Sequence, residues 1–444
     1  MLWVMDARPR TISGPTRLRR SRRRLIIATI LIALLTIGSY LALTNNPHVW
    51  PYRNTLQYHV LHTWWSLTGS GVPAGRGTIE GTVRDSTSKP IAHARILVAE
   101  RNGTPHSAEA DDAGRYRIPD VPAADYVPVA GAPGFADVAV RRAGLFRIAI
   151  IAGQVSGLDL SLNPLVESPI PPAEHFSLDP PRTLKIDAPL PATAVERQIH
   201  FEVGGKPNQV SFYYTPANNT SSAWPTILAV YPGPADTWKQ VSLPLAQAGY
   251  AVIAVGPAYA LDLEPDVDDL LRLIAMLKQG GFPHADPQRL AALGGSYSSL
   301  HVFRLLERPG NNLRAILLLG PPTDLFELRR QFESGTFFPP FGLDQALIAL
   351  GFPDRNPEPY WRYSARYHAR AFNVPIMLIH SKADEVVPFT QSQLLADDLR
   401  RLGKPYELHI LEGMGHYLLE PKRTPAIDDL FRTTTGFLAR ELRK

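Results

Sequence analysis

A serine between small residues stands at the centre of the stretch Leu293–Ser299, which reads LGGSYSS. An apolar run over residues 289–293 precedes it and predicts a strand, and residues 300–307 behind it have helical spacing. A serine on a sharp turn from strand to helix presents its hydroxyl to solvent as a nucleophile, and small neighbours allow the tight backbone. A glycine- and serine-rich turn without chemistry has the same composition, so this stretch alone leaves both interpretations open.

An alcohol attacks a carbonyl only when a base removes its proton, and the base needs an acid that orients it. Asp384 follows the strong apolar run at residues 375–379, so its carboxylate is expected at the carboxyl edge of a sheet. Glu385 is a weaker candidate because adjacent side chains point in different directions, and Asp324 is a second choice. A carboxylate that merely caps a loop is the alternative interpretation of Asp384.

The base candidate is His416, in the glycine-rich stretch Gly413-Met414-Gly415-His416 after the predicted strand at residues 406–411. The chain has 13 histidines, and we interpret His380, His301 and His368 as structural or pocket-lining. Ser296, Asp384 and His416 stand in that order along the chain, 88 and 32 residues apart, each behind a predicted strand. That order and context are typical of a Ser-Asp-His triad on an α/β sheet.

The elements that must position these residues alternate between strands and helices. Strands are predicted at residues 209–214, 225–231, 249–255, 289–293, 315–319, 375–379 and 406–411. Helices are predicted at residues 241–248, 265–277, 300–307, 390–402 and 426–442. This alternation predicts a mostly parallel sheet with helices on both faces.

At this point the domain resembles the α/β-hydrolase superfamily, in particular its prolyl-oligopeptidase and dienelactone-hydrolase branches. Beyond the serine turn, the resemblance rests on Asp286-Pro287-Gln288-Arg289, Tyr363-Ser364-x-x-Tyr367 ahead of Val374-Pro375, Asp384-x-x-Val387-Pro388 and Gly415-His416. It runs over residues 200–440 and implies an α/β-hydrolase fold in which Ser296 is the nucleophile, Asp384 the acid and His416 the base.

Two departures from the family pattern concern the backbone around the serine. The glycine usual two places after the nucleophile is Ser298 here, and the usual His-Gly of the oxyanion loop is replaced by the stretch Tyr231–Asp236 (YPGPAD). Proline has no N–H to donate. The expected oxyanion donors are therefore the backbone N–H of Tyr297 and one from Gly233 or Ala235. A fold that has lost its activity stays an alternative on this ground.

Residues 76–163 change to a period of two and predict a small all-β sandwich. They resemble the carboxypeptidase regulatory-like (transthyretin-like) domain through Ile79-x-Gly81-x-Val83, residues 89–98 (KPIAHARILV), Gly114-Arg115-Tyr116-x-Ile118, and Asp125-Tyr126 followed by Pro133-Gly134-Phe135. The resemblance implies an accessory module without catalytic groups.

Residues 164–190 contain seven prolines and predict a stiff linker. Aromatic residues at 325–372 predict either a cap over the site or helical core packing.

The N-terminal region predicts a membrane anchor. Residues 25–44 contain no charge and are long enough as a helix to cross a bilayer, and eight arginines lie within residues 1–24. The positive-inside rule places residues 1–24 in the cytoplasm and the rest of the chain outside. A cleaved signal peptide and a buried soluble helix are the alternatives.

The charge and the lack of cysteine exclude several classes of function. The net charge of +5 comes from residues 1–24, which contribute +7, so the rest of the chain sums to −2 and nucleic-acid binding is not expected. The chain has no cysteine, so disulfides, thiolate metal sites and a cysteine nucleophile are excluded.

The sequence thus predicts six segments: a basic tail (1–24), a transmembrane helix (25–44), a connector (45–75), a β-sandwich (76–163), a linker (164–190) and an α/β-hydrolase domain (191–444). The predicted function is that of a single-pass membrane-anchored serine hydrolase, catalytic domain outside, that cleaves small-molecule ester or peptide substrates without metal or cofactor. The alternatives are a prolyl-oligopeptidase-like peptidase and an inactive binding protein at the cell surface.

Overall fold

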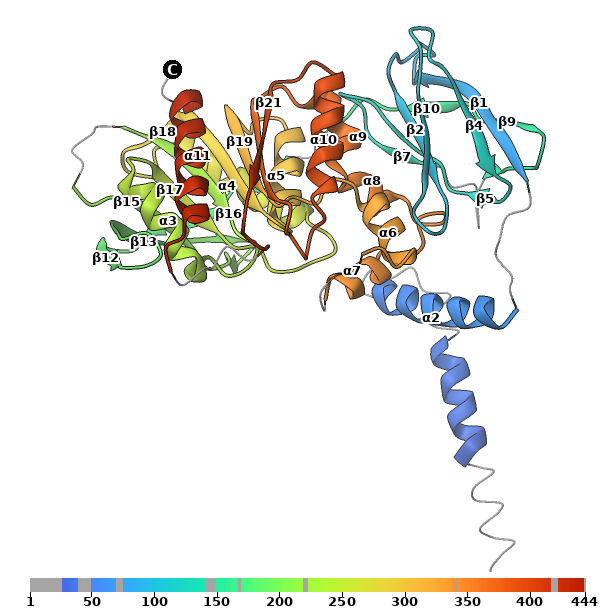
Figure 1. The fold of residues 1–444 in the computed structure, drawn as a ribbon, viewed down its shortest axis with the longest axis horizontal. Coiled ribbons are helices and arrows are strands. Elements are labelled where there is room, and N and C mark those ends of the chain that lie inside the picture. Colours follow the sequence, from blue (N-terminus) through green and yellow to red (C-terminus); the bar gives the residue numbers. More distant parts are fainter. Residues whose placement is uncertain are drawn as a thin grey trace, which may run out of the picture. The chain divides into compact units, whose positions relative to one another are not determined.

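The computed structural model describes residues 26–38, 49–68, 75–140, 148–166, 169–218, 223–337, 339, 342–416 and 422–442. The chain divides into two compact units, Met1–Thr68 and Gly69–Lys444 (Figure 1). The second unit holds the predicted β-sandwich and the predicted hydrolase domain together. Each unit is described by itself.

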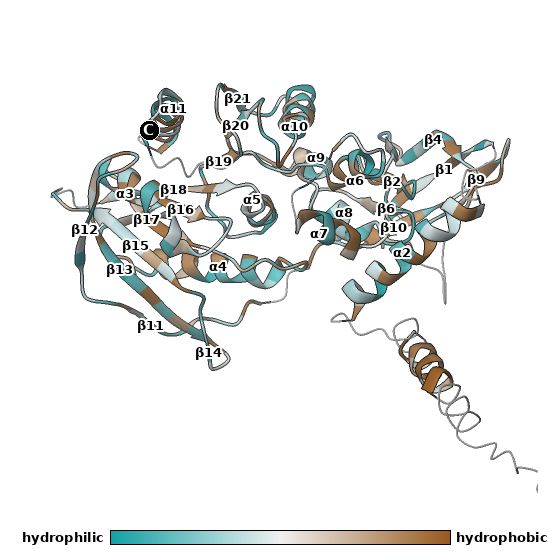
Figure 2. Ribbon diagram, turned by 60° about the horizontal axis from the view of Figure 1, so that its bottom comes forward, coloured by the Kyte–Doolittle hydropathy of each residue, from teal (hydrophilic) through white to brown (hydrophobic). Residues whose placement is uncertain are grey.

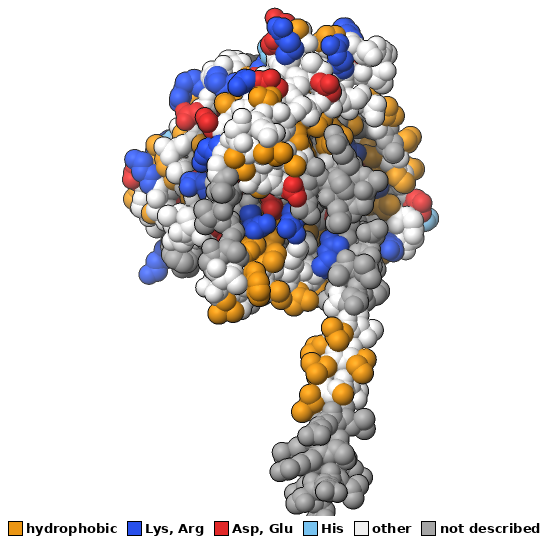
Figure 3. Space-filling model, turned by 90° about the vertical axis from the view of Figure 1, so that its right-hand side faces the viewer, with side chains coloured by type: hydrophobic (Ala, Val, Ile, Leu, Met, Phe, Trp, Pro, Cys, Tyr) orange, Lys and Arg blue, Asp and Glu red, His pale blue; other side chains and the backbone are white. Residues whose placement is uncertain are grey.

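The first unit contains a helix over residues 26–38 and α2 (Trp50–Thr68). The large apolar side chains of the first helix, such as Ile32, Leu34 and Leu35, are exposed. Figure 2 shows the hydrophobic colouring of this helix, and Figure 3 shows apolar side chains on its surface. Among the described residues, no helix combines the length and the apolar character needed to span a bilayer. Residue 25 and residues 39–44 of the predicted anchor lie outside the described residues.

The hydrolase domain is built on a sheet of 11 strands within the described part of the chain. From β17 through β16, β18, β19 and β20 to β21 neighbouring strands are parallel, whereas the other edge, with β11 to β15, is antiparallel. The strands are β11 (Glu174–Leu178), β12 (Arg182–Ile186), β13 (Ala192–Val203), β14 (Lys206–Pro207), β15 (Ser211–Pro216), β16 (Trp224–Val230), β17 (Ala251–Val255), β18 (Ala285–Gly295), β19 (Ala315–Leu319), β20 (Ile376–Ser381) and β21 (Tyr406–Leu411).

Helices cover both faces of this sheet, as the alternation of elements predicts (Figure 1). One face packs against α4 (Glu264–Lys278), α5 (Ser298–Glu307) and α10 (Thr390–Arg401), and the other against α3 (Lys239–Gln247) and α11 (Pro425–Leu442). Central strands alternate their side chains between the two cores: Leu318 faces the first core, and Leu317 the second. Because β18, β19, β20 and β21 are parallel, the loops behind them open at one common edge, where Ser296, Asp384 and His416 stand.

The prediction of a linker over residues 164–190 is wrong for its second half. Residues 174–178 and 182–186 form β11 and β12, which both pair antiparallel with β13. Phe176 packs edge-on against Phe282, with the ring centroids 5.3 Å apart, and the Pro171 carbonyl accepts a hydrogen bond from Arg272. The prolines around residues 174–186 concealed the alternation of apolar and polar side chains that is typical of strands. The long strand β13 was not predicted either.

The β-sandwich has the predicted character, with a core of its own around Ile79, Val83, Ile96 and Ile118. Its two main sheets have the orders β10-β1-β4, where β9 also pairs with β1, and β3-β2-β6-β7. The strands are β1 (Arg76–Asp85), β2 (Arg95–Ala99), β3 (Pro105–Glu109), β4 (Arg115–Pro122), β5 (Asp125–Tyr126), β6 (Val129–Gly131), β7 (Val138–Ala139), β8 (Ile148–Ala149), β9 (Val155–Gly157) and β10 (Leu160–Leu162).

The aromatic insertion at residues 325–372 packs against this β-sandwich. Its helices are α6 (Leu325–Glu333), α7 (Leu343–Ala349), α8 (Glu358–Arg362) and α9 (Ala365–His368). Phe326, Tyr360 and Trp361 are buried in one apolar cluster with Leu97 and Val129 of the sandwich. Core packing, one of the two predicted roles of the insertion, is therefore observed. Phe338 and Phe341 lie outside the described residues.

The turn between β2 and β3 lies against helix α6 of the insertion. Gly103 there has φ +100°, and a Cβ atom on it would lie 2.5 Å from the Phe326 carbonyl oxygen and 2.8 Å from the Arg330 nitrogen. We expect Gly103→Val to force this turn away from α6 and to lower the free energy of unfolding by about 1–3 kcal/mol. Urea unfolding of the full chain measures the change.

The matched control is Gly134→Val. Gly134 also has a positive φ, +82°, but its Cβ position has no neighbour within 4 Å. Both substitutions therefore strain the backbone, and only the one at Gly103 meets α6. Equal losses of stability in the two variants would show that the contact between the domains contributes nothing.

Candidate active site

Ser296 occupies a sharp turn between β18, which ends at Gly295, and α5, which begins at Ser298. Its φ of 51° is unusual for a residue with a side chain, and its backbone N–H donates to the Leu319 carbonyl at 2.8 Å. Such strain is maintained only where the surroundings hold it, and it is common at functional sites. The turn therefore has the geometry of a nucleophile elbow.

Ser298, which replaces the usual glycine, links the elbow to the neighbouring strand. Its side chain is fully buried, its Oγ donates to the Val230 carbonyl at 2.6 Å, and it accepts the Gly295 N–H at 3.0 Å. Val230 is the last residue of β16, which leads into the predicted oxyanion loop. Ser298 thus links the start of the oxyanion loop to the nucleophile elbow by a hydrogen bond. Its position in the motif did not predict this role.

We expect Ser298→Ala to remove the hydrogen bonds of this hydroxyl to the Val230 carbonyl and the Gly295 N–H and to lower the free energy of unfolding by about 1–3 kcal/mol. The neighbouring Ser299 offers a matched control, since its Oγ is buried without a hydrogen-bond partner among the described residues. Ser299→Ala should therefore leave stability unchanged or raise it slightly. Urea unfolding of both variants tests the pair, and equal losses would contradict the assignment.

The structure brings Ser296, His416 and Asp384 together into one hydrogen-bonded chain. Nε2 of His416 lies 2.8 Å from the Ser296 Oγ, and Nδ1 of the same ring lies 2.8 Å from Oδ2 of Asp384. The side chains of His416 and Asp384 are almost completely shielded from water. Because the Ser296 hydroxyl lies within hydrogen-bond distance of Nε2 of His416, a proton can pass from the hydroxyl to the imidazole.

Asp384 is held in its ionised form. Burial acts to raise its pKa, but hydrogen bonds from His380, His416 and the Val387 N–H hold the pKa well below its usual range. Oδ1 accepts the backbone N–H groups of Val386 and Val387 at 2.9 and 2.7 Å, which leaves Oδ2 to face the imidazole. An ionised carboxylate at Nδ1 selects the tautomer whose Nε2 accepts the serine proton.

Three further residues support the Asp–His pair: His380, which was predicted to be structural or pocket-lining, Glu385, and Gly320, which no motif indicated. His380 is fully buried, with Nε2 3.3 Å from Asp384 and Nδ1 2.7 Å from the Ser392 Oγ. Glu385 accepts the backbone N–H of His416 at 3.1 Å, so the weaker acid candidate holds the histidine loop. Gly320 leaves space for the pair, because a Cβ there would lie 3.1 Å from Asp384.

The other candidates lie in structural contacts. Asp324 is fully buried, caps α6 by accepting the Glu327 N–H, and pairs with Arg366 at 3.0 Å. His301 on α5 lies 3.4 Å from Asp266, and Nε2 of His368 lies 3.0 Å from the Trp361 carbonyl. These positions agree with the interpretation of both histidines as structural. Among the described residues, no group of three His, Asp or Glu side chains could hold a metal ion.

The predicted oxyanion donors differ in their surroundings. The N–H of Tyr297 has no acceptor among the described residues, and its phenol is fixed by hydrogen bonds to Ala260. The N–H of Gly233 donates to the Tyr231 carbonyl at 2.9 Å. Ala235 is fully buried against Gly256, where an added Cβ would lie 2.6 Å from the Ala235 nitrogen. Which of the two supplies a second donor stays a prediction.

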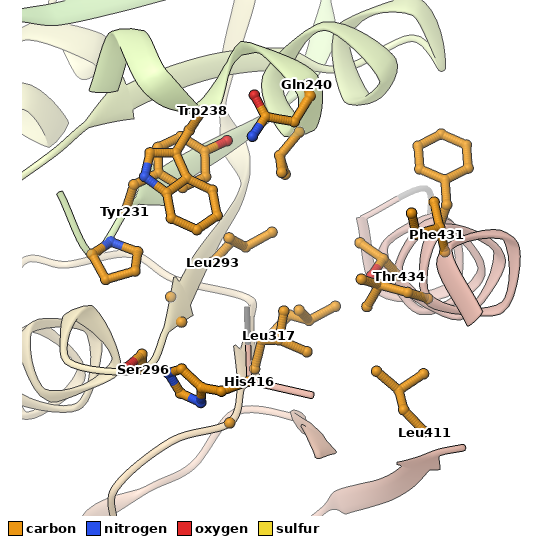
Figure 4. A pocket seen from close by; sticks show the side chains of 18 of the residues that line it. Tyr231, Trp238, Gln240, Leu293, Ser296, Leu317, Leu411, His416, Phe431 and Thr434 are labelled. Carbon is orange, nitrogen blue, oxygen red and sulfur yellow. Dashed lines mark hydrogen bonds between the residues drawn. The ribbon is translucent and has the colours of Figure 1, made fainter. Parts of the chain in front are cut away.

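A cavity of about 420 Å³ opens beside the Ser296 hydroxyl. Figure 4 shows Leu293 and Leu317 between the serine and α11, with Trp238 at the side. The Trp238 ring is stacked on Tyr231, with the centroids 5.1 Å apart, and the phenol of Tyr231 is hydrogen-bonded to Ser242 at 2.8 Å. The volume of the cavity is that of a small-molecule binding pocket.

Two family profiles match the chain, the carboxypeptidase regulatory-like domain over residues 78–163 and the prolyl oligopeptidase family over residues 262–444. The uncharacterized peptidase YuxL of Bacillus subtilis (strain 168) is 24% identical over 235 residues, which cover 47% of this chain and 34% of the relative. Human dipeptidyl peptidase 8 is 26% identical over 225 residues, covering 45% and 23%. The chain thus spans about a third or less of the length of these relatives.

Among solved structures, the acylaminoacyl peptidase of Pyrococcus horikoshii has a TM-score of 0.43 at 20% identity, covering 61% of this chain and 43% of that one. The profile matches agree with the two resemblances that the sequence motifs indicate, and with the serine elbow on the α/β sheet. The chain therefore combines a region that matches the carboxypeptidase regulatory-like domain, residues 78–163, with a region that matches the prolyl oligopeptidase family, residues 262–444.

Proposed function

We propose that the chain hydrolyses esters or amides through an acyl-enzyme on Ser296. His416 removes the proton of the Ser296 hydroxyl through Nε2 while Oγ attacks the carbonyl carbon, and Asp384 stabilises the imidazolium that forms. The same histidine then protonates the leaving alcohol or amine, and water releases the acyl group by the reverse sequence. The observation that carries this proposal is the continuous Asp384–His416–Ser296 hydrogen-bond chain, with both distances 2.8 Å.

The negative charge of the tetrahedral intermediate needs donors that are aimed at it in advance. We assign one donor to the backbone N–H of Tyr297, the first residue behind the nucleophile. The second comes from the loop that holds Gly233 and Ala235, and in the case of Gly233 the loop must first release the hydrogen bond to Tyr231. Loss of one donor of this kind typically costs about 100- to 1,000-fold in rate.

Small esters are our first substrate class and peptides the second. The peptidase alternative is favoured by the prolyl oligopeptidase profile and by the two peptidase relatives. Turnover of p-nitrophenyl butyrate and of an aminoacyl p-nitroanilide by the full chain separates the classes. We expect the ester to be cleaved faster. Cleavage of the anilide alone would establish a peptidase, and cleavage of neither would favour a binding protein.

We further propose that residues 25–44 tether the enzyme to the cell membrane, with the catalytic domain outside. The support is the uncharged run of apolar residues next to an arginine-rich tail, and the exposed apolar side chains of the helix over residues 26–38. Protease added to intact cells, or to spheroplasts where an outer membrane exists, should remove the domain behind residue 75. Full protection of that domain would overturn the orientation.

A further inference from the structure

The cavity beside Ser296 continues as a channel between two helices on one face of the sheet. We define the acyl channel by its walls: Leu293, Leu317 and Leu411 on the sheet, Val241 on α3, and Phe431 and Thr434 on α11. Figure 4 shows Ser296 and His416 at one end of this channel and the side chains of Phe431 and Thr434 on α11 at the other. Leu293, Leu317 and Leu411 are buried and form the floor of the channel, whereas Val241 and Phe431 on the helices are half-buried, so the channel is partly open to solvent.

The chemistry of the walls selects an uncharged, apolar occupant. No lysine, arginine or glutamate is found among the described residues that line the channel. The carboxylate of Asp384 is already bonded to His416 and to two backbone N–H groups. A charged peptide terminus would therefore enter without a counter-ion, at a large cost in desolvation.

The mechanism decides which part of the substrate occupies the channel. The acyl group stays bonded to the Ser296 Oγ until water attacks, whereas the alcohol must leave after the first step. An apolar channel with a buried floor suits the part that stays. Resting on the proposed hydrolase activity, we propose that the acyl channel binds the alkyl chain of a medium-chain fatty acyl ester and makes the enzyme selective for such esters.

The test is a series of p-nitrophenyl esters, from acetate through butyrate and octanoate to laurate, with the full chain. We expect kcat/KM to rise by up to about fourfold for each methylene that the channel buries, corresponding to about 0.8 kcal/mol, and then to level off. A second series of alkyl acetates lengthens only the alcohol and should be flat. A rise in the alcohol series instead of the acyl series would overturn the assignment.

Substitution of Thr434 blocks the channel. This residue is buried on α11 and faces the cavity, so a phenylalanine there would occupy the space of the alkyl chain. We expect Thr434→Phe to lower the ratio of kcat/KM for octanoate over acetate at least tenfold. The matched control is Thr433→Phe, on the neighbouring, half-buried threonine that faces His409, and it should keep the wild-type ratio.

The outcomes separate this inference from the proposed function. If the wild-type chain cleaves none of the esters, the proposed hydrolase activity is refuted, and the acyl channel, which rests on that activity, is refuted with it. If it cleaves acetate and octanoate equally well, or if Thr434→Phe keeps the wild-type ratio while circular dichroism shows an intact fold, the hydrolase proposal stands and the acyl channel is refuted.

Discussion

Replacing Ser296 by alanine is expected to lower kcat for p-nitrophenyl butyrate by about 10⁶-fold, the loss typical when the nucleophile of a triad is removed. The Oγ that His416 contacts at 2.8 Å is the atom that forms the acyl-enzyme, and no neighbouring hydroxyl occupies its position on the elbow. The stability of the fold should change little, because this hydroxyl is part of no core contact. Ester turnover and urea unfolding measure the two quantities.

The control for this substitution is Ser299→Ala, three residues further along the chain. Ser299 is buried in α5 and is not among the described residues that line the cavity beside Ser296, so Ser299→Ala should keep full activity. Retention of a substantial part of the wild-type rate in Ser296→Ala would mean that another group performs the attack, and the proposed mechanism would then fall.

The second large effect is expected from Asp384→Asn, which should lower kcat by about 10⁴-fold. An amide at this position can present an N–H to Nδ1 of His416 and so favour the wrong tautomer of the ring. Asp324→Asn is the informative comparison, since Asp324 pairs with Arg366 and caps α6. It should lose stability but keep most of kcat in the fraction that stays folded. The reverse pattern would make Asp324 the acid.

The lowered pKa of Asp384 gives this comparison a pH dependence. A carboxylate whose pKa is lowered by folding stabilises the native state above its unfolded pKa, near 4, and loses that contribution as the pH falls through the native value. Wild type and Asp384→Asn should therefore differ most in unfolding free energy near neutral pH and converge in acid. A constant difference at every pH would show that the asparagine acts through packing and not through charge.

Much of the catalytic domain could be predicted because its signals are local. Residues 315–319 are a short apolar run and residues 406–411 alternate between apolar and polar side chains, and the elements found there are β19 and β21 with the same bounds. The grouping of Ser296, Asp384 and His416 follows from parallel strands whose carboxyl ends meet at one edge. Neither inference needs to know how distant parts of the chain pack.

The features that were missed depend on contacts between distant residues. The hydrogen bond from Ser298 to Val230 spans 68 residues, and the hydrogen bond from His416 to Glu385 spans 31. No local sequence pattern predicts contacts over such separations. The strands β11 and β12 are stabilised by pairing with β13, and the prolines that flank them in the sequence conceal this pairing. The aromatic insertion was ambiguous because its partners, Leu97 and Val129, belong to the other domain.

The central claim is that Ser296 is the nucleophile. The most direct measurement is labelling of the full chain with a fluorophosphonate, followed by peptide mass spectrometry to locate the adduct. The account predicts one phosphonylated residue, Ser296, and no labelling after His416→Ala, because the hydroxyl then lacks its base. An adduct on another residue, or none on the folded wild-type chain, would contradict it.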